Sequence, residues 1–429
     1  MSRRFKTRGA RNAAAAERAA RAQRKPVGLA YADDLGRIYF DDEATPMADG
    51  GDVRVPRKDE LILAPPGTVP TMLPGRAPLL DDFTVPDFRI VVGALLPAGY
   101  TRLLLPAFRT SANAPTLPLF GYTYACVVKD ELYVAAMQTD ASDDWTPRTF
   151  AVGELESLVA ARRARDAQNG VLAQLATCAC SYACFTAQNV FLERGEAALP
   201  VSPTCNARCI GCISEQDSDT GFPSPQTRVT NDASADELAR IALAHLEVVP
   251  DGIVSFGQGC EGEPLLRVTT IALAIEKIRA ATSAGTININ TNGSLTASFQ
   301  TLVDAGLDAA RVSLNSFRPD AYAAYYRPIG YDLNDVFATV RAGVAGGLRV
   351  SLNLLTHPGV TDDVREVAAA DAFLREVPVT MVQTRTLNID PDRYFRVVGR
   401  PESPPVGMRT ALHRITEAGV RVGNFTHAH

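Results

Sequence analysis

The sequence lacks any apolar run long enough to cross a lipid bilayer, which takes roughly 18–20 residues. Its longest apolar stretch, 90–99, is shorter and contains both glycine and proline. The basic start of the chain leads into no apolar segment, so the pattern of a secretory signal is missing as well. These absences argue against a membrane-spanning or exported protein, and we expect a cytoplasmic one.

Histidine is scarce, and no two of the five histidines have the H-x-x-x-H spacing of a helical zinc site. His427 and His429 lie close together in the terminal tail, where we expect only adventitious metal binding. The glycine-rich P-loop that cradles nucleotide phosphates is missing too. The sequence therefore offers neither a histidine-based zinc site nor a P-loop nucleotide site.

Cysteine is absent after Cys260, and six of the eight cysteines lie between 178 and 212. A disulfide framework would spread them along a chain with a secretory signal, and this chain has neither feature. Clustered cysteines in such a chain favour a reducing compartment and metal binding.

Charges of opposite sign are separated along the sequence. Residues 1–25 hold nine Lys or Arg and one Glu, whereas the whole chain has a net charge of −5. We expect a disordered basic arm over 1–28, most simply a solvated tail. Contact with RNA or DNA and an organelle transit peptide are the alternatives, and the acidic remainder weakens the first of them.

The residue pattern of the remaining sequence predicts several separate regions. Short strand-like segments separated by Pro and Gly predict a β-rich N-terminal domain over 29–150, including a hairpin of 122–128 with 131–137. A helical, cysteine-containing connector is expected over 151–196, beginning with a helical stretch over 153–176 that is interrupted at Gly170. A C-terminal extension over 391–429 holds one helix and a terminal strand candidate, 420–424.

Between 197 and 390, strand-like and helix-like segments alternate. Six such units predict an α/β domain with a parallel sheet, as an open partial (β/α)6 barrel rather than a closed eightfold one. The active site of such a barrel lies at the carboxyl ends of its strands. The predicted strands are Ala198–Val201, Gly252–Phe256, Thr286–Asn290, Ala310–Leu314, Arg349–Leu354 and Val379–Thr384.

The loop after the first of these strands contains Cys205, Cys209 and Cys212 at C-x-x-x-C-x-x-C spacing. A four-iron cluster needs four ligands, so three thiolates leave one iron open for another ligand. Arg208 lies within the loop, where a cation favours thiolate over thiol. Structural zinc is the alternative, although it takes four ligands, usually from C-x-x-C pairs.

Polar residues follow the next strands at their ends. The segment 257–264 reads Gly-Gln-Gly-Cys-Glu-Gly-Glu-Pro, in which glycines let the backbone approach a ligand and Glu263 offers a carboxylate. Asn292, Ser313 and Asn315 follow the third and fourth strands, although turns and helix caps use the same residue types. Asn353 is expected to face the barrel interior, where it needs a ligand or an internal partner.

These motifs, in this order over about 197–390, resemble those of the radical S-adenosylmethionine (SAM) superfamily. The resemblance implies that superfamily's fold, a partial TIM barrel. The cysteine spacing matches, whereas Glu261 stands where the family's Gly-Gly-Glu-Pro motif has its first glycine. The resemblance implies that the three cysteines hold a 4Fe–4S cluster and that SAM ligates its open iron. The SAM-binding residues it implies are Gly262, Glu263, Asn292, Ser313 and Asn315, with Asn353 as a further candidate.

The resemblance also implies a mechanism. One electron from the reduced cluster, supplied by a donor such as flavodoxin or ferredoxin, cleaves SAM to methionine and a 5′-deoxyadenosyl radical, which abstracts hydrogen from a substrate. The substrate is open, with peptide or protein modification and RNA modification as candidates. A protein of a different class, a non-catalytic zinc- or iron–sulfur-binding protein, is the alternative.

A second cysteine group, Cys178, Cys180 and Cys184, suggests an auxiliary iron–sulfur cluster, with Cys126 or Cys260 as a further ligand. Family members usually carry such clusters C-terminal to the barrel, where this chain has no cysteine. Ordinary buried cysteines are the simpler interpretation. For Cys260, which lies beside the residues expected to bind methionine, a role in redox chemistry or in contacting the substrate is the alternative to cluster binding.

Overall fold

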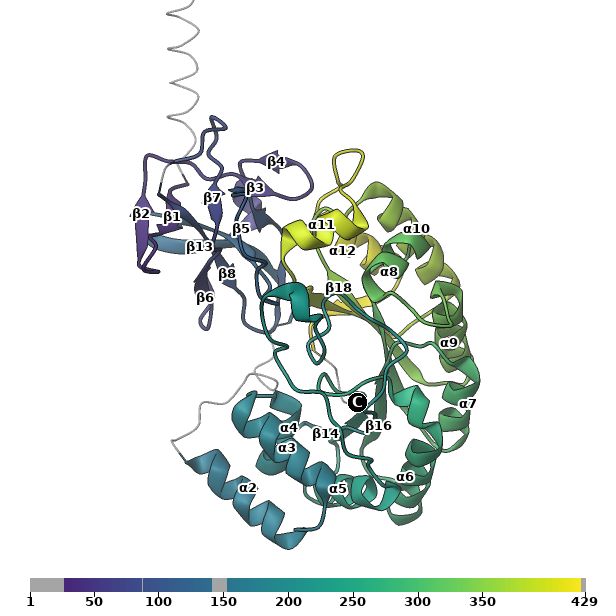
Figure 1. The fold of residues 1–429 in the computed structure, drawn as a ribbon. Helices are drawn as coiled ribbons and strands as arrows, with labels where there is room; N and C mark the ends of the chain where they lie inside the picture. The colour runs from purple at the N-terminus through teal and green to yellow at the C-terminus, as the bar shows by residue number, and fades with distance from the viewer. Residues whose placement is uncertain (1–26, 87, 141–152, 426–429) are drawn as a thin grey trace, which may run out of the picture.

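The computed structural model describes residues 27–86, 88–140 and 153–425 (Figure 1). The basic arm expected over 1–28 lies almost entirely outside the described residues, as do His427 and His429. Within the described ranges a strand-rich N-terminal part lies beside the C-terminal side of a curved α/β domain. A group of three helices connects the two parts in sequence (Figure 1).

The α/β domain is built on one parallel sheet whose strands follow their order in the sequence. The α/β fold class is thus confirmed, and the strands at the six expected places are joined by a seventh, because the terminal strand candidate pairs in parallel with β19. The strands are β14 (Glu196–Leu199), β15 (Ile253–Phe256), β16 (Thr286–Thr291), β17 (Ala309–Leu314), β18 (Arg349–Thr356), β19 (Met381–Thr386) and β20 (Arg421–Gly423).

Helices cover the outer face of this sheet (Figure 1). Strand β18 shows the consequence, because its helix-facing Val350, Leu352 and Leu354 are buried, whereas the alternate residues are only half-buried. The interior of the barrel is therefore the more open face and is free to carry polar groups. The helices are α5 (Ala235–Val248), α6 (Val268–Ala281), α7 (Thr296–Asp304), α8 (Pro319–Tyr326), α9 (Leu333–Ala345), α10 (Val364–Glu376), α11 (Pro391–Val398) and α12 (Met408–Glu417).

Side-chain caps set the starts of two of these helices. Ser234 and Glu237 form a reciprocal capping box at α5, and Asp332 and Asp335 form another at α9. Each box satisfies backbone N–H groups that have no partner within the helix. The local sequence thereby fixes where the chain turns back toward the sheet.

The N-terminal part is centred on a sheet of order β2-β1-β8-β12-β13-β5, with β6 against β8 and β9 against β13. The expected hairpin is present as β12 and β13, joined by Lys129 and Asp130. Both residues have φ above +50°, which the tight turn requires and which glycine usually supplies. The strands are β1 (Leu29–Ala32), β2 (Ile38–Asp41), β3 (Ala48–Asp49), β4 (Val53–Arg54), β5 (Leu61–Leu63), β6 (Val69–Met72), β7 (Arg76–Pro78), β8 (Ile90–Leu95), β9 (Tyr100–Arg102), β10 (Leu105–Pro106), β11 (Phe108–Thr110), β12 (Thr123–Val128) and β13 (Glu131–Gln138).

Buried polar contacts fix the N-terminal part onto the ends of β18 and β19. The fully buried Arg102 guanidinium donates to the Leu387 carbonyl at 3.3 Å and to the Tyr122 carbonyl of its own domain at 2.9 Å. Arg76 forms an ion pair with Asp390 at 2.7 Å, and both side chains are 3% exposed. Because each buried group needs its partner, these contacts hold the two parts in one relative position.

The connector consists of α2 (Glu154–Arg165), α3 (Gly170–Ser181) and α4 (Phe185–Leu192). The helical stretch expected over 153–176 is divided because Asn169 caps α3, accepting the Leu172 N–H at 3.0 Å. Among the described residues no single helix is long and apolar enough to span a membrane. The pair α3 and α4 has the required length and composition only when taken together, and it is bent by 113° between the two helices.

Candidate active site

The loop that carries the three cysteines leaves β14 and is held by backbone hydrogen bonds across the barrel mouth. The N–H groups of Arg208 and Ile210 donate to the carbonyls of Tyr326 and Tyr325, at 3.0 and 3.1 Å. Gly211 packs so closely on α8 that a Cβ there would lie 2.7 Å from the Tyr325 hydroxyl. The loop is therefore fixed by the end of α8, far away in the sequence.

The thiols of Cys205, Cys209 and Cys212 are half-buried. Burial, with smaller contributions from neighbouring thiols, raises the pKa of Cys205 to about 11, and it also raises the pKa of Cys209 well above the usual value of a thiol. A bound soft metal replaces such protons. Within the described ranges, no three His, Cys, Asp or Glu side chains converge on one ion. In a four-iron cluster each thiolate has its own iron, so the donor set fits a cluster without such convergence.

A cation from outside the loop contacts one of these thiols. The Arg228 guanidinium donates to Cys212 Sγ at 3.4 Å and to Ser214 Oγ at 3.2 Å. Arg208, the cation noted in the sequence, is exposed. No local pattern points to Arg228, because it follows a long irregular segment after the cysteines.

The glycine loop after β15 is paired with the cysteine loop. Gly262 N–H donates to the Ser202 carbonyl at 2.7 Å, and Glu263 N–H to the Thr204 carbonyl at 2.8 Å. A Cβ at Gly262 would lie 1.9 Å from the Thr204 oxygen, so only glycine fits there. The two motifs singled out in the sequence thus form one structural unit.

The Glu263 carboxylate is buried at the centre of this unit. It accepts the N–H groups of Leu265 at 3.0 Å and Asn292 at 2.8 Å, and the Thr291 hydroxyl. Burial raises its pKa to about 7. The Asn292 amide in turn donates to Asn206 Oδ1 in the cysteine loop at 2.8 Å. Glu263 and Asn292 therefore connect the end of β16 to both loops.

Glu261, which departs from the family motif, has a structural role at the base of the cysteine loop. Its carboxylate accepts the N–H groups of Val201 at 2.8 Å, Ser202 at 2.7 Å and Gln258 at 2.6 Å. Burial raises its pKa to about 7 against the lowering effect of these three donors. A glycine in this position would leave those three donors without this partner.

A cavity of about 570 Å³ opens beside the cysteine loop, a volume typical of small-molecule sites, which run from about 300 to 1,000 Å³. Four parts of the chain line it: the cysteine loop, the end of α8, the ends of β17 to β20, and the N-terminal domain. The N-terminal contribution has no sequence signal, because nothing in 29–150 resembles a catalytic motif. The principal lining residues are Leu95, Leu96, Pro97, Ala98, Phe120, Cys209, Cys212, Ser313, Leu355, Arg385 and Asn388.

The predicted polar residues of the strand ends are placed differently from one another. Ser313 lines the cavity and lies next to Asn353 in the sheet register. Asn353 Oδ1 is buried and has no hydrogen-bond partner within the described part of the chain. Asn315 is fully buried instead, donating to the Ala321 carbonyl at 3.1 Å and the Tyr394 hydroxyl at 3.2 Å. The structure thus brings Ser313 and Asn353 together but places Asn315 under α8.

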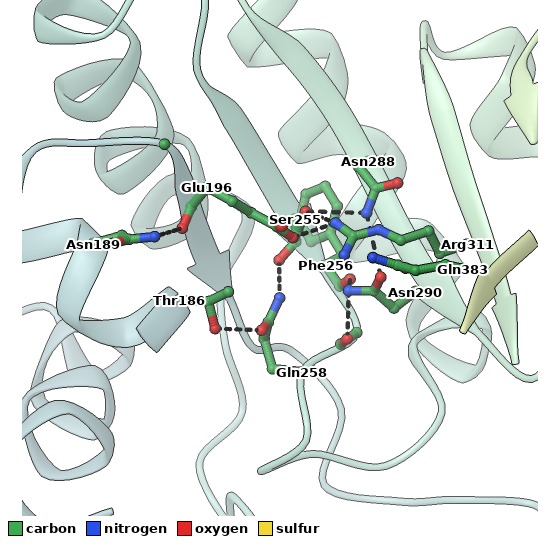
Figure 2. A network of polar contacts seen from close by, with 12 residues as sticks. Thr186, Asn189, Glu196, Ser255, Phe256, Gln258, Asn288, Asn290, Arg311 and Gln383 are labelled. Atoms are coloured by element: carbon green, nitrogen blue, oxygen red, sulfur yellow. Dashed lines mark hydrogen bonds and ion pairs between the residues drawn. The ribbon is translucent and has the colours of Figure 1, made fainter. Parts of the chain in front are cut away.

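Deeper in the barrel lies a polar network (Figure 2). Arg311 from β17 forms an ion pair with Glu196 from β14 and donates to Ser255 Oγ at 3.2 Å. Asn290 donates to the Phe256 carbonyl at 3.2 Å. These contacts join the first four strands from the inside and satisfy each other's buried groups.

The second cysteine group does not come together as a set. Cys178 is buried, whereas Cys180, two residues further along α3, is exposed on another side of the helix. The Cys260 thiol hydrogen-bonds Cys178 and lowers its pKa to about 7. Cys126 lies in the core of the N-terminal domain. An auxiliary cluster on Cys178, Cys180 and Cys184 therefore stays a prediction, with Cys260 as the neighbour that the fold supplies.

An open parallel barrel with three thiols on the loop after its first strand defines a class of protein that binds an iron–sulfur cluster at the barrel mouth. Residues 199–372 match the family model described as "Radical SAM superfamily". The part of the chain that forms most of the barrel therefore matches a radical SAM domain, and the cofactors of that superfamily are a 4Fe–4S cluster and SAM.

Two relatives are GTP 3′,8-cyclases. The one from Rhodobacter capsulatus is 32% identical over 166 residues, 38% of this chain and 44% of that protein. The one from Heliobacterium modesticaldum is 28% identical over 231 residues, 52% of this chain and 63% of that protein. The chain spans about half the length of the curated relatives it matches.

Among solved structures, a radical SAM methyltransferase from Sphaerobacter thermophilus aligns with a TM-score of 0.38 at 17% identity. The alignment covers 53% of this chain and 64% of that one. Streptococcus suis SuiB bound to S-adenosylmethionine aligns with a TM-score of 0.36 at 14% identity, covering 56% of this chain and 50% of that one.

Proposed function

We propose that this protein is a radical SAM enzyme in which Cys205, Cys209 and Cys212 hold the 4Fe–4S cluster. When bound, the cluster would supply the electron for cleaving SAM to methionine and a 5′-deoxyadenosyl radical, which would abstract hydrogen from the substrate. The observation that carries the proposal is the pairing of the glycine loop with the cysteine loop beside a ligand-sized cavity.

The chain's own residues hold the cysteine loop in place and offer polar atoms to SAM. Gly262 and Glu263 hold the cysteine loop through its carbonyls, and Asn292 holds it through Asn206. Ser313 and Asn353 offer polar atoms at the strand ends, and the partnerless Asn353 Oδ1 supports a role in binding SAM. Glu263 accepts three protein donors, two at Oε1 and one at Oε2, and so positions the two loops; its remaining acceptor site at Oε2 suits the amino group of SAM.

The amide nitrogen of Asn315 donates to α8 and to Tyr394, whereas its buried Oδ1 has no hydrogen-bond partner among the described residues. We therefore assign it a positioning role, holding α8, whose end in turn holds the cysteine loop.

Anaerobic reconstitution tests the cluster assignment. The wild-type protein should bind about four irons per chain and show a reduced-state EPR signal that changes when SAM is added. The variant with all three cluster cysteines changed to Ala should lose this signal. If iron stays at the level of a full cluster in that variant, the remaining iron belongs to Cys178, Cys180, Cys184 or Cys260.

A non-catalytic zinc- or iron–sulfur-binding protein is the competing function. It requires a closed ligand set, whereas the cysteine loop offers three thiols. A colourless protein that binds zinc in place of iron after anaerobic reconstitution would establish this alternative.

Three classes of substrate are candidates. The curated relatives make GTP the first small molecule to test, and peptide or protein modification and RNA modification are the other candidates. Conversion of GTP, detected by mass spectrometry in a reaction with SAM and a reductant, would select the first. A one-electron donor such as flavodoxin or ferredoxin is expected as partner.

A further inference from the structure

Arg385, near the end of β19, lines the cavity together with Cys209 and Cys212. Within the described part of the chain, its guanidinium has no hydrogen bond to a protein group and no carboxylate within ion-pair distance. A guanidinium carries five N–H donors in a planar fork that matches a carboxylate or a phosphate. A half-buried arginine without such a partner is a group that a ligand can satisfy.

The charged groups around Arg385 are engaged elsewhere. Glu196 forms an ion pair with Arg311, and the Asp140 carboxylate accepts the Asn424 N–H. Burial, followed by repulsion from Arg311, lowers the pKa of Arg385 to about 10 despite these two carboxylates. The charged guanidinium is therefore less stabilised by the protein than it is in water.

An apolar wall lies in the same cavity. It is formed by Leu95 and the following residues of the β8–β9 turn, and by Phe120, whose side chain is 44% exposed. These residues come from the N-terminal domain, which the buried Arg102 and Arg76 fix in place. One cavity thus combines an unpaired cation on the barrel, an apolar surface on the N-terminal domain and the thiols of the cysteine loop.

We propose that Arg385 binds an oxyanion group of the substrate, a carboxylate or a phosphate, whose attached apolar portion packs on the wall of residues 95–98 and Phe120. This inference rests on the proposed function, because it places the substrate in the cavity of the cluster. SAM carries a carboxylate of its own, so the test has to separate the two sources of the oxyanion.

The test uses the reconstituted protein with SAM bound, and benzoate and benzamide as probes. These two share a planar apolar body and differ in charge. Wild-type protein should bind benzoate about tenfold or more tightly than benzamide, as a charged hydrogen bond implies. Arg385→Gln should remove that preference and leave the affinity for SAM at the wild-type value. Calorimetric titration measures all three affinities.

Arg421→Gln is the matched control, because Arg421 lies on the adjacent strand, at the opposite end of the barrel interior, and is exposed. It should keep both the benzoate preference and the SAM affinity. Equal binding of benzoate and benzamide to wild-type protein would overturn the proposal. A loss of SAM affinity in Arg385→Gln with the benzoate preference retained would overturn it too, by assigning the guanidinium to the SAM carboxylate.

The proposed function and this inference fail in different ways. If the wild-type protein binds no iron–sulfur cluster, the proposed function fails, and the same titration on the protein as purified still decides the role of Arg385. If it binds cluster and SAM but does not prefer benzoate, only the inference fails.

Discussion

Arg228 illustrates how one residue acts on the candidate centre. Its guanidinium donates to Cys212 Sγ at 3.4 Å, and hydrogen bonds to cluster sulfurs are among the features that set reduction potentials. A cation at this distance stabilises the more negative, reduced state of a cluster held there.

We therefore expect Arg228→Gln to lower the reduction potential of the reconstituted cluster. An EPR-monitored redox titration measures it. The potential of Arg228→Lys should lie between those of the wild-type protein and Arg228→Gln. The control, Arg208→Gln, removes an exposed cation of the loop itself and should leave the potential unchanged. A potential that is unchanged or raised in Arg228→Gln would show that the contact does not act on the cluster.

At Gly262 a single added methyl group should disrupt the contact between the glycine loop and the cysteine loop. A Cβ there would lie 1.9 Å from the Thr204 carbonyl oxygen, so the glycine loop and the cysteine loop would have to separate. We expect Gly262→Ala to cost about 1–3 kcal/mol of unfolding free energy and to reduce iron incorporation. Chemical denaturation and iron analysis measure both.

Gly170→Ala is the control for this substitution. Its Cβ would meet nothing closer than 3.4 Å, at the start of α3, where alanine is favoured over glycine. It should be neutral or slightly stabilising. If the two alanine variants unfold alike, the close approach at Gly262 is not what holds the loops together.

At the scale of elements, Glu366 on α10 holds the start of α8. It accepts the Phe317 N–H at 2.6 Å and the Ser316 hydroxyl, and burial raises its pKa to about 7. Arg318 and Asp363 are the charged groups that face it. Because the folded pKa lies above the usual 4.5, the folded state binds the proton more tightly than the unfolded state does.

The stabilisation from this proton is complete below about pH 4.5 and is lost as the pH rises toward 7. Between these pH values the free energy of unfolding should fall by on the order of 3 kcal/mol for one such group, and replacing Glu366 by Gln should reduce this fall. Denaturant titrations at pH 5 and pH 7.5 compare the two proteins. An identical pH dependence in both would mean that Glu366 ionises as freely in the folded protein as in the unfolded chain.

The contact between the two domains depends on the Arg76–Asp390 pair, in which both side chains are 3% exposed. Arg76→Met leaves Asp390 buried without its cation, and we expect a loss of about 3–5 kcal/mol. Arg375→Gln, which breaks the exposed pair with Asp371, should cost less than about 1 kcal/mol. Thermal unfolding distinguishes them, and equal small losses would argue against a rigid domain contact.

The elements also show what the sequence could predict. The alternation of apolar segments predicted the strands of the barrel because their buried faces must be apolar, and the spacing of Cys205, Cys209 and Cys212 is local. Arg228 carries no such pattern, because its role follows from where distant segments meet. Strand β20 was visible as a segment, but its parallel pairing with β19 was not.

In the molecule as a whole, the candidate site is assembled from segments that lie far apart in the described chain. The barrel supplies the cysteine loop and the strand ends, and the N-terminal domain supplies the apolar wall of the cavity. The N-terminal domain reaches the cavity through buried contacts far apart in sequence, such as Arg102 to Leu387. Sequence alone could not place these contacts, since an arginine in a β-rich segment has many equivalent surroundings.

In the proposed function, the three thiols of the cysteine loop support the cleavage of SAM. The most direct measurement is the amount of 5′-deoxyadenosine formed from SAM by the reconstituted, chemically reduced protein, with the triple variant Cys205→Ala, Cys209→Ala, Cys212→Ala beside it. We expect the wild-type protein to form 5′-deoxyadenosine and the triple variant to form none. Equal amounts from both proteins, or none from a wild-type protein with a full cluster, would contradict it.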